Sequence, residues 1–258
     1  MIELASRDAT VLVSPHDGGR IASLVVHGRE LLVTGTSSDD PMRWGSYPMT
    51  PWAGRVRRGR FSFAGEDHEL PITLGPHAIH GTTYDRPWSV EPDGSLAIDL
   101  GSSWPFGGHA RQRFDLTDEQ LVCTLEVRAD RQAMPAMVGW HPWYRRPVEL
   151  TFSAASMYER DDDGMPSGRL ITPPPPGPWD DCFTGVDTPP VLRFGEGPTA
   201  DVTLTVTSDC DHWVVYDQPT HAVCVEPQSG PPDSCTIAPF IIEPGAPLVR
   251  SMTLRWAG

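Results

Sequence analysis

Lysine is absent from the 258-residue sequence, so arginine supplies all 20 basic residues. This absence excludes a Schiff-base nucleophile and the phosphate-binding lysine of a P-loop. Acidic residues number 34, which gives a formal net charge of −14. A charge of this sign argues against electrostatic binding of nucleic acid and against a polybasic membrane anchor. We therefore expect neither a nucleic-acid partner nor a membrane partner.

Cysteine is scarce, and no two cysteines form a C-x-x-C pair. An odd number of scattered cysteines is typical of reduced thiols in a cytoplasmic protein. No segment approaches the ~18 uninterrupted apolar residues that a membrane span needs, and the N-terminal MIELASRDATVLV has no basic segment leading into an apolar stretch. We expect neither export nor membrane insertion. The five cysteines are Cys123, Cys182, Cys210, Cys224 and Cys235.

Glycine and proline are abundant, with 24 and 28 residues, and they separate many short β-branched runs instead of forming one linker. This pattern predicts an all-β protein, a sandwich or barrel with frequent turns. We expect one domain over residues 1–258. Predicted strands include Thr10–Val13, Ile21–Val26 and Leu121–Val127. Residues 35–50 consist of breakers and small polar residues and predict a long loop with a binding role.

The segment Ala222–Ser234, AVCVEPQSGPPDS, combines an apolar strand with a turn-rich sequence. Glu226 therefore falls at the end of a buried strand, beside a loop that leaves room for a ligand. A carboxylate in that position is suited to act as a general base or to bind hydroxyl groups. The alternative is a solvated loop acid, because glutamate is mostly exposed.

Two more segments contain candidate ligand-binding residues. In a regular strand, Arg55 and Arg57 share one face, while Arg58 and Arg60 share the other, so that one pair can line a site. The alternative is an arginine-rich edge strand that resists aggregation. The segment His80–Gly81 closes an apolar strand end, where a structural histidine is as plausible as a ligand-binding one.

His141 lies in the aromatic segment GWHPWY, and tandem aspartates follow a proline-rich connector at Asp180 and Asp181. Neighbouring aromatic rings desolvate a histidine, which suits either a core residue or an acid/base catalyst. Tandem aspartates after such a connector are usually solvated, and they become candidates only in company with the other residues.

The order of these segments resembles the aldose 1-epimerase (mutarotase) family. The resemblance rests on PWAGRVRRGRF, on His80–Gly81 25 residues after Arg55, on GWHPWY, on Asp180 three residues before a phenylalanine, and on EPQSGPP. It covers almost the whole chain and implies a galactose-mutarotase-like β-sandwich of two large antiparallel sheets. The sequence departs from the family at Gly54, where asparagine is usual, so one polar sugar contact is lost or supplied elsewhere.

The resemblance also implies a reaction, the interconversion of the α and β anomers of free hexoses such as glucose or galactose. A base removes the proton from the C1 hydroxyl and an acid protonates the ring oxygen, so the ring opens and recloses. We expect no metal and no organic cofactor, and a monomer or a homodimer. The expected roles are Glu226 as base, His141 as acid, Arg55, His80 and Asp180 as clamps with Asp181 as the rival carboxylate, and Trp52 and Trp143 as cavity walls.

Two alternatives remain open. A hexose-6-phosphate 1-epimerase would bind phosphate through Arg57, Arg58, Arg145 or Arg146. A carbohydrate-binding protein without catalytic activity would use the same fold, and Gly54 keeps that hypothesis in view. One polarimetric assay with free and phosphorylated glucose distinguishes all three.

Three apparent motifs, for calcium, for a dinucleotide and for a metal ion, are rejected because the surrounding sequence does not fit them. ERDDDGMPSGRL has contiguous acids and lacks the final glutamate of a calcium loop. Residues 194–200 fit a dinucleotide fingerprint, but Asp201–Thr207 alternates like a strand where a helix is required. His77 and His80 are three residues apart, with no third metal ligand at a recognisable spacing.

Overall fold

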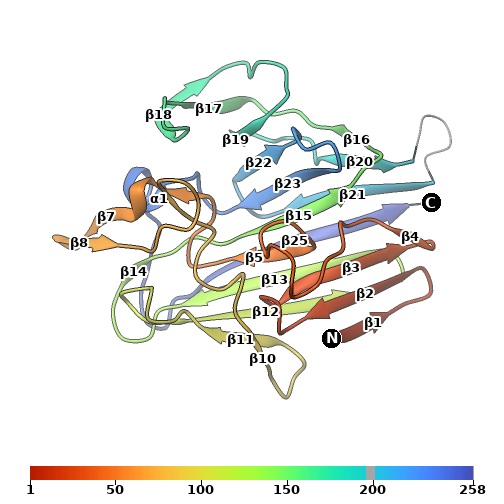
Figure 1. The fold of residues 1–258 in the computed structure, drawn as a ribbon, viewed down its shortest axis with the longest axis horizontal. Coiled ribbons are helices and arrows are strands. Elements are labelled where there is room, and N and C mark those ends of the chain that lie inside the picture. Colours follow the sequence, from red (N-terminus) through yellow and green to blue (C-terminus); the bar gives the residue numbers. More distant parts are fainter. Residues whose placement is uncertain (196–200, 258) are drawn as a thin grey trace.

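The computed structural model describes residues 1–195 and 201–257, and strands dominate them (Figure 1). The described helices are α1 (Ser234–Ile237) and a single 3-10 turn, η1 (Arg57–Gly59). The predicted all-β class with two large antiparallel sheets is confirmed. None of the helices in the described part of the chain is both long and apolar enough to cross a membrane.

The larger sheet contains eleven strands, ten in one path and β4 (Arg29–Glu30) beside β3. It brings segments that are far apart in the sequence side by side, from β1 at the N-terminus to β23. The path runs through β1 (Ile2–Ala5), β2 (Ala9–Ser14), β3 (Arg20–Val26), β5 (Ser46–Met49), β15 (Gly139–Arg145), β23 (Ala222–Gln228), β22 (His212–Tyr216), β19 (Asp180–Thr184), β17 (Ser156–Arg160) and β18 (Pro166–Ile171).

The second sheet contains eight strands, and three two-stranded pairs complete the described architecture. The eight strands are β10 (Ser89–Val90), β11 (Leu96–Asp99), β12 (His109–Leu116), β13 (Gln120–Arg128), β25 (Leu248–Ala257), β21 (Val202–Ser208), β20 (Val191–Phe194) and β16 (Val148–Thr151). The pairs are β6 (Arg55–Val56) with β9 (Ala78–Ile79), β7 (Arg60–Phe63) with β8 (Glu66–Glu69), and β14 (Met134–Pro135) with β24 (Ile241–Ile242).

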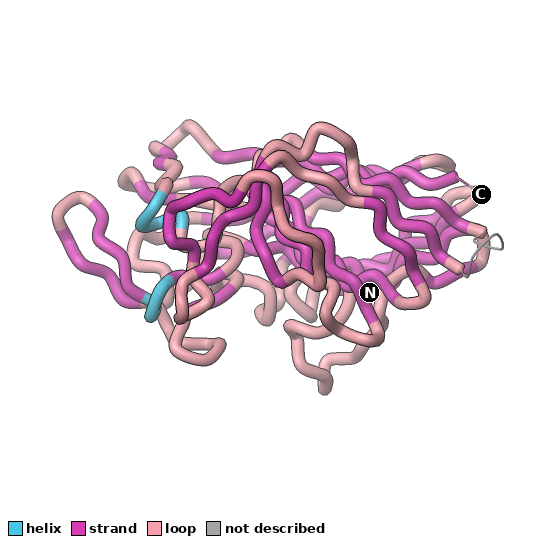
Figure 2. The backbone as a smooth tube through the Cα atoms, turned by 90° about the horizontal axis from the view of Figure 1, so that it is seen from above, coloured by secondary structure: helices cyan, strands magenta, loops and turns pink. Residues whose placement is uncertain are grey.

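The main core forms where the two large sheets pack face to face (Figure 2). Because side chains alternate along a strand, every second residue of each central strand enters this core. In β13 these residues are Leu121, Cys123, Leu125 and Val127, and in β23 they include Val225. The opposite face of β23 is therefore free to carry other chemistry.

Most strand predictions are confirmed, with two corrections. Arg55 and Arg57 do not lie on one regular strand, because β6 ends at Val56 and η1 begins at Arg57. The segment 35–50 was expected to be a loop throughout, but its last residues form β5, which pairs with β15 through Met49 and Gly139. Pairing with a central strand outweighs the breaker composition of this segment. The predicted strand after Asp201 is confirmed as β21. Residues 196–200 of the rejected dinucleotide motif lie outside the described residues.

Candidate active site

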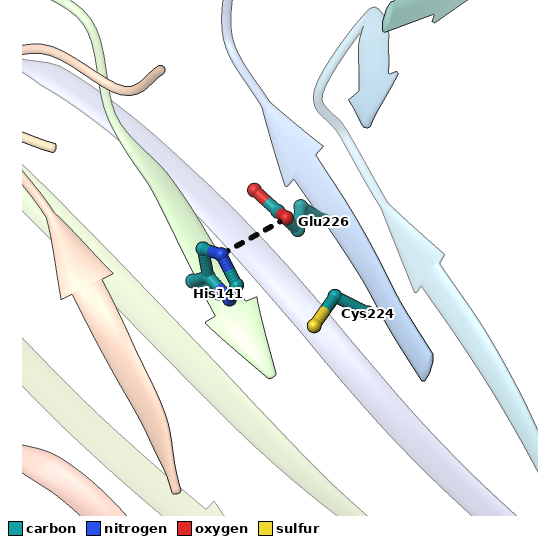
Figure 3. Close-up of side chains that lie close together, drawn as sticks. All are labelled: His141, Cys224 and Glu226. Atoms are coloured by element: carbon teal, nitrogen blue, oxygen red, sulfur yellow. Dashed lines mark ion pairs between the residues drawn. The ribbon is translucent and has the colours of Figure 1, made fainter. Parts of the chain in front are cut away.

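Two neighbouring central strands position the catalytic candidates. Gly139 pairs with Gln228 and Trp143 pairs with Cys224, so His141 of β15 and Glu226 of β23 lie between these pairs in register. Both side chains project from the face opposite the main core. Nε2 of His141 lies 3.2 Å from Oε1 of Glu226 (Figure 3). Both residues are buried, with 5% and 2% of their surface exposed.

Neighbouring side chains fix the orientation of this pair. Nε2 of Gln228 donates a hydrogen bond of 3.0 Å to Oε2 of Glu226, which leaves Oε1 directed at the histidine. The imidazole of His141 is stacked between the rings of Tyr47 and Trp143, at centroid distances of 4.8 and 5.3 Å. The geometry is therefore held by packing and does not depend on a flexible loop.

Burial controls the protonation of both groups. Desolvation, followed by the negative charge of Asp180, raises the pKa of Glu226 well above its ordinary value. Desolvation also lowers the pKa of His141 to about 3, and the positive charge of Arg20 adds to this effect. Both shifts disfavour a net charge on the pair. Both shifts therefore favour a pair that is neutral overall, with one titratable proton shared between the two groups.

A cavity opens over this pair, and His141, Glu226 and Gln228 line it together with Arg55, His80, Asp180 and Trp143. The structure thus brings to one cavity all the residues expected at the site except Trp52. Nη2 of Arg55 lies 3.5 Å from Oδ2 of Asp180. Residues separated by 171 positions in the sequence, Arg55 and Glu226, converge here because β6 and β9 cover the sheet face that carries the pair.

His80 reaches the cavity through an unusual backbone conformation. Its φ is +60°, and its amide donates a hydrogen bond of 3.0 Å to the carbonyl of Gly54. Gly81 follows with φ +84°, and a Cβ there would lie 2.0 Å from the carbonyl oxygen of Thr50. Glycine is therefore required at position 81, while His80 tolerates a strained backbone conformation. Burial, followed by the charges of His141 and Arg55, keeps the pKa of His80 well below 6.5, so this ring is neutral.

Asp180 and Asp181 have different surroundings. Asp180 lies opposite Tyr216, which lies opposite Cys224, so its side chain shares the face that carries Glu226. Burial raises the pKa of Asp180, while the charges of Arg55 and Arg160 oppose the shift. Asp181 also lines the cavity, but it forms a 2.8 Å ion pair with Nε of Arg160. The register that places Asp180 on the face of Glu226 therefore favours Asp180 as the carboxylate nearest the pair.

Gly54 lines the cavity with a φ of +65°. A Cβ at this position would lie 3.1 Å from both Cβ and Cγ of Pro232, so Pro232 occupies the space beside it. The family's asparagine at this position would be crowded by that proline.

The expectation for Trp52 as a cavity wall is corrected. Its ring is buried in the main core, 5.6 Å from the ring of Trp104, and it does not line the cavity of the described residues. Sequence analysis missed Tyr47, Tyr216, Arg160 and Gln228, which do line it. Of these four residues, only Gln228 could have been predicted from the sequence, because it lies two residues after Glu226 on the same strand and so shares its face.

The arginines proposed to bind phosphate all have other contacts. Arg57 forms a 2.7 Å ion pair with Asp161, and Arg58 forms a 3.1 Å ion pair with Asp163. Arg145 and Arg146 lie at a separate surface depression and bind mainly backbone carbonyls. These four side chains are not among the residues that line the cavity in the described structure.

Among the described residues, three side chains of the kinds that bind metal ions gather at the site. His141, Cys224 and Glu226 each direct one ligand atom into the same small region, and all three are buried (Figure 3). His77 is not part of this group, since its Nδ1 accepts a hydrogen bond from the amide of Arg58.

Comparisons with known proteins agree on one family. The model of the Aldose 1-epimerase family matches residues 1–251. The uncharacterized protein YphB of Escherichia coli (strain K12) is 28% identical over 104 residues, and that match covers 38% of this chain and 36% of YphB. The match therefore spans little more than a third of the length of that relative.

Solved structures share the fold along the whole chain. An Escherichia coli K12 protein, provisionally described as an aldose 1-epimerase, superposes with a TM-score of 0.85 at 20% identity, covering 99% of this chain and 98% of that chain. The GalM/aldose epimerase homologue of C. elegans gives 0.84 at 15% identity, with 99% and 98% covered. Galactose 1-epimerase of Lactobacillus acidophilus NCFM gives 0.82 at 17% identity, with 99% and 93% covered.

These likenesses confirm the galactose-mutarotase-like fold that the resemblance implied. The family match extends over nearly all of the sequence and includes every segment that contributes to the cavity. The chain belongs to the aldose 1-epimerase family.

Proposed function

We propose that this protein interconverts the α and β anomers of free hexoses such as glucose or galactose. Glu226 removes the proton of the C1 hydroxyl, and His141 delivers a proton to the ring oxygen. The ring opens, the aldehyde rotates and the ring recloses on either face. Arg55, His80 and Asp180 bind the hydroxyl groups, and Trp143 offers an apolar face to the sugar.

The observation that carries this proposal is the buried His141–Glu226 contact of 3.2 Å at the floor of an open cavity. A protonated glutamate beside a neutral imidazole contains the same number of protons as a carboxylate beside an imidazolium. Transfer of one proton from Oε1 to Nε2 therefore produces the base and the acid together. No exchange of protons with solvent is needed before the ring opens.

A neutral sugar matches the charges that line the cavity. Four carboxylates and three guanidinium groups line it, so there is no excess of positive charge for a phosphate. The neutral imidazole of His80 suits a hydroxyl group, because it can donate with one nitrogen and accept with the other. The carboxylates belong to Asp40, Asp180, Asp181 and Glu226, and the guanidinium groups belong to Arg43, Arg55 and Arg160.

Polarimetry tests the proposal. Freshly dissolved α-glucose and α-galactose should reach their equilibrium rotation faster with the protein than in buffer, and glucose 6-phosphate should not be accelerated to the same degree. Acceleration of the phosphorylated sugar alone would favour a hexose-6-phosphate 1-epimerase. Sugar binding without acceleration would identify a carbohydrate-binding protein and refute the proposal.

The cellular setting is part of the same proposal. All five cysteines are free and buried. This state suits the reducing cytoplasm, where free hexoses are metabolised. We propose that residues 1–258 act there as one domain, as a monomer or a homodimer.

A further inference from the structure

We propose that a zinc ion binds to His141, Cys224 and Glu226 and thereby inhibits the enzyme. The ligand atoms are a ring nitrogen of His141, Sγ of Cys224 and a carboxylate oxygen of Glu226, which come from two adjacent strands, β15 and β23 (Figure 3). Imidazole, thiolate and carboxylate are all established zinc ligands, and a thiolate selects zinc over magnesium or calcium.

The spacing of these atoms suits one tetrahedral ion. Zinc–nitrogen and zinc–oxygen bonds of roughly 2.0 to 2.2 Å at a tetrahedral angle require the two ligand atoms to be about 3.3 to 3.6 Å apart. Nε2 of His141 and Oε1 of Glu226 are 3.2 Å apart. All three ligand atoms lie within 4.8 Å of one another. A zinc–sulfur bond of roughly 2.3 Å requires Sγ to be about 3.5 to 3.7 Å from the other two atoms, a small adjustment of the Cys224 side chain.

The sheet itself fixes this juxtaposition. Cys224 and Glu226 are two residues apart on β23, so they project from the same face. Cys224 is fully buried and pairs with Trp143 in register, while His141 and Glu226 line the cavity. An ion at this point would have protein ligands below it and the cavity on its open side. That arrangement leaves a fourth coordination position for a water molecule or a sugar hydroxyl.

Neighbouring contacts preorganise two of the ligands. Gln228 holds Oε2 of Glu226 and leaves Oε1 available, while stacking between Tyr47 and Trp143 fixes the plane of the His141 ring. Partners of this kind orient metal ligands and contribute to affinity. On binding, the thiol of Cys224 and the His141–Glu226 pair each lose one proton to solvent, so that Sγ becomes a thiolate and Nε2 and the carboxylate can coordinate the ion.

Inhibition follows from which atoms the ion would occupy, and this part of the inference depends on the proposed function. Zinc bound to Nε2 and to the carboxylate would block the two groups that transfer protons during ring opening. Cys224 takes no part in that transfer, so removal of its sulfur should spare the reaction and remove the inhibition.

Calorimetric titration of the full chain with Zn²⁺ tests binding independently of activity. We expect one ion per chain, and Cys224→Ser should weaken binding by at least about 10- to 100-fold. Cys182→Ser is the matched control, because Cys182 lines the same cavity and is not part of the ligand group. It should bind zinc as the wild type does. Absence of binding by the wild type, or equal affinity in Cys224→Ser and the wild type, would overturn the inference.

Cobalt provides a second, spectroscopic readout that is independent of activity. Co²⁺ bound to the wild type should show a thiolate-to-cobalt absorption band in the near ultraviolet, which would be absent from Cys224→Ser and present in Cys182→Ser. A wild-type cobalt complex without this band, or loss of the band in both variants, would contradict the assignment. In polarimetry, zinc should slow the wild type and the Cys182→Ser variant, and a chelator should restore the rate. Tight zinc binding together with an unaltered rate would refute inhibition.

Discussion

Strands β13 and β23 occupy central positions in different sheets, and their inward faces are alike. Each contributes alternate apolar residues, such as Leu125 and Val225, to the same core. Their outward faces differ. The outward residues Thr124 and Glu126 of β13 are partly exposed, as is usual for a sheet face beside water. On β23 the outward residues are Cys224, Glu226 and Gln228, and all three are buried.

The comparison separates stability from function. Inward residues of both strands are explained by packing alone. A carboxyl buried on an outward face is costly to the folded state unless its charge is neutralised or paired. Glu226 shares its proton with His141 and accepts a hydrogen bond from Gln228, which limits that cost. Buried polar residues on an outward face therefore mark the site more clearly than any apolar pattern does.

The largest effect is expected at Glu226. Glu226→Gln keeps the size of the side chain but removes the base, so kcat should fall by about 10²- to 10⁴-fold with little change in KM. His141→Asn should have a similar effect, because it removes the acid of the same step. Polarimetric progress curves provide the measurement. A Glu226→Gln variant that keeps most of the rate would show that the base is another group.

A core substitution on β13 should instead lower the stability of the protein and leave substrate binding unchanged. Leu125→Ala leaves a cavity between the sheets and should lower the free energy of unfolding by about 2 to 5 kcal/mol, while the folded fraction keeps its KM. Thr124→Ala, its neighbour on the outward face, should change stability by less than about 0.5 kcal/mol. Chemical denaturation of both variants checks this contrast. Equal losses would mean that the two faces of β13 do not differ as described.

Arg55 should affect binding as well as rate, because a clamp acts on both the bound sugar and the transition state. Loss of its charge-assisted hydrogen bonds, worth about 1.5 to 3 kcal/mol, predicts a fall in kcat/KM of about 10- to 100-fold for Arg55→Ala. Arg57→Ala is the control, since Arg57 pairs with Asp161 outside the cavity lining. A similar kinetic loss in both variants would remove the special role of Arg55.

A smaller effect, on KM, should distinguish Trp143 from Trp52. Trp143→Leu removes an aromatic wall worth about 0.5 to 1.5 kcal/mol, which predicts a two- to tenfold rise in KM. Trp52→Leu should instead destabilise the protein and leave KM unchanged, because Trp52 packs against Trp104 in the core. A raised KM in the folded Trp52→Leu variant would restore Trp52 as a cavity wall.

The fold was predictable because period-two runs and glycine- or proline-rich turns extend through the chain. The strand that carries Glu226 was predictable for the same reason, but it continues to Gln228 and does not end at Glu226 as expected. Family motifs supplied His141, Arg55, His80 and Asp180. The prediction for Trp52 was wrong because the sequence does not show whether a tryptophan next to a motif faces the cavity or the core. Tyr47 lies on β5, whose neighbour β15 comes from a distant part of the sequence, and no local pattern reveals such a pairing.

The pH dependence of kcat/KM tests the shared proton of the buried pair most directly. An ordinary histidine takes up a proton as the pH falls through 6.5, whereas burial lowers the pKa of His141 to about 3. The pair should therefore keep its single proton, and kcat/KM for glucose should stay constant as the pH falls from about 8 to 5. A loss of half the activity near pH 6.5, absent from the uncatalysed reaction, would contradict the account.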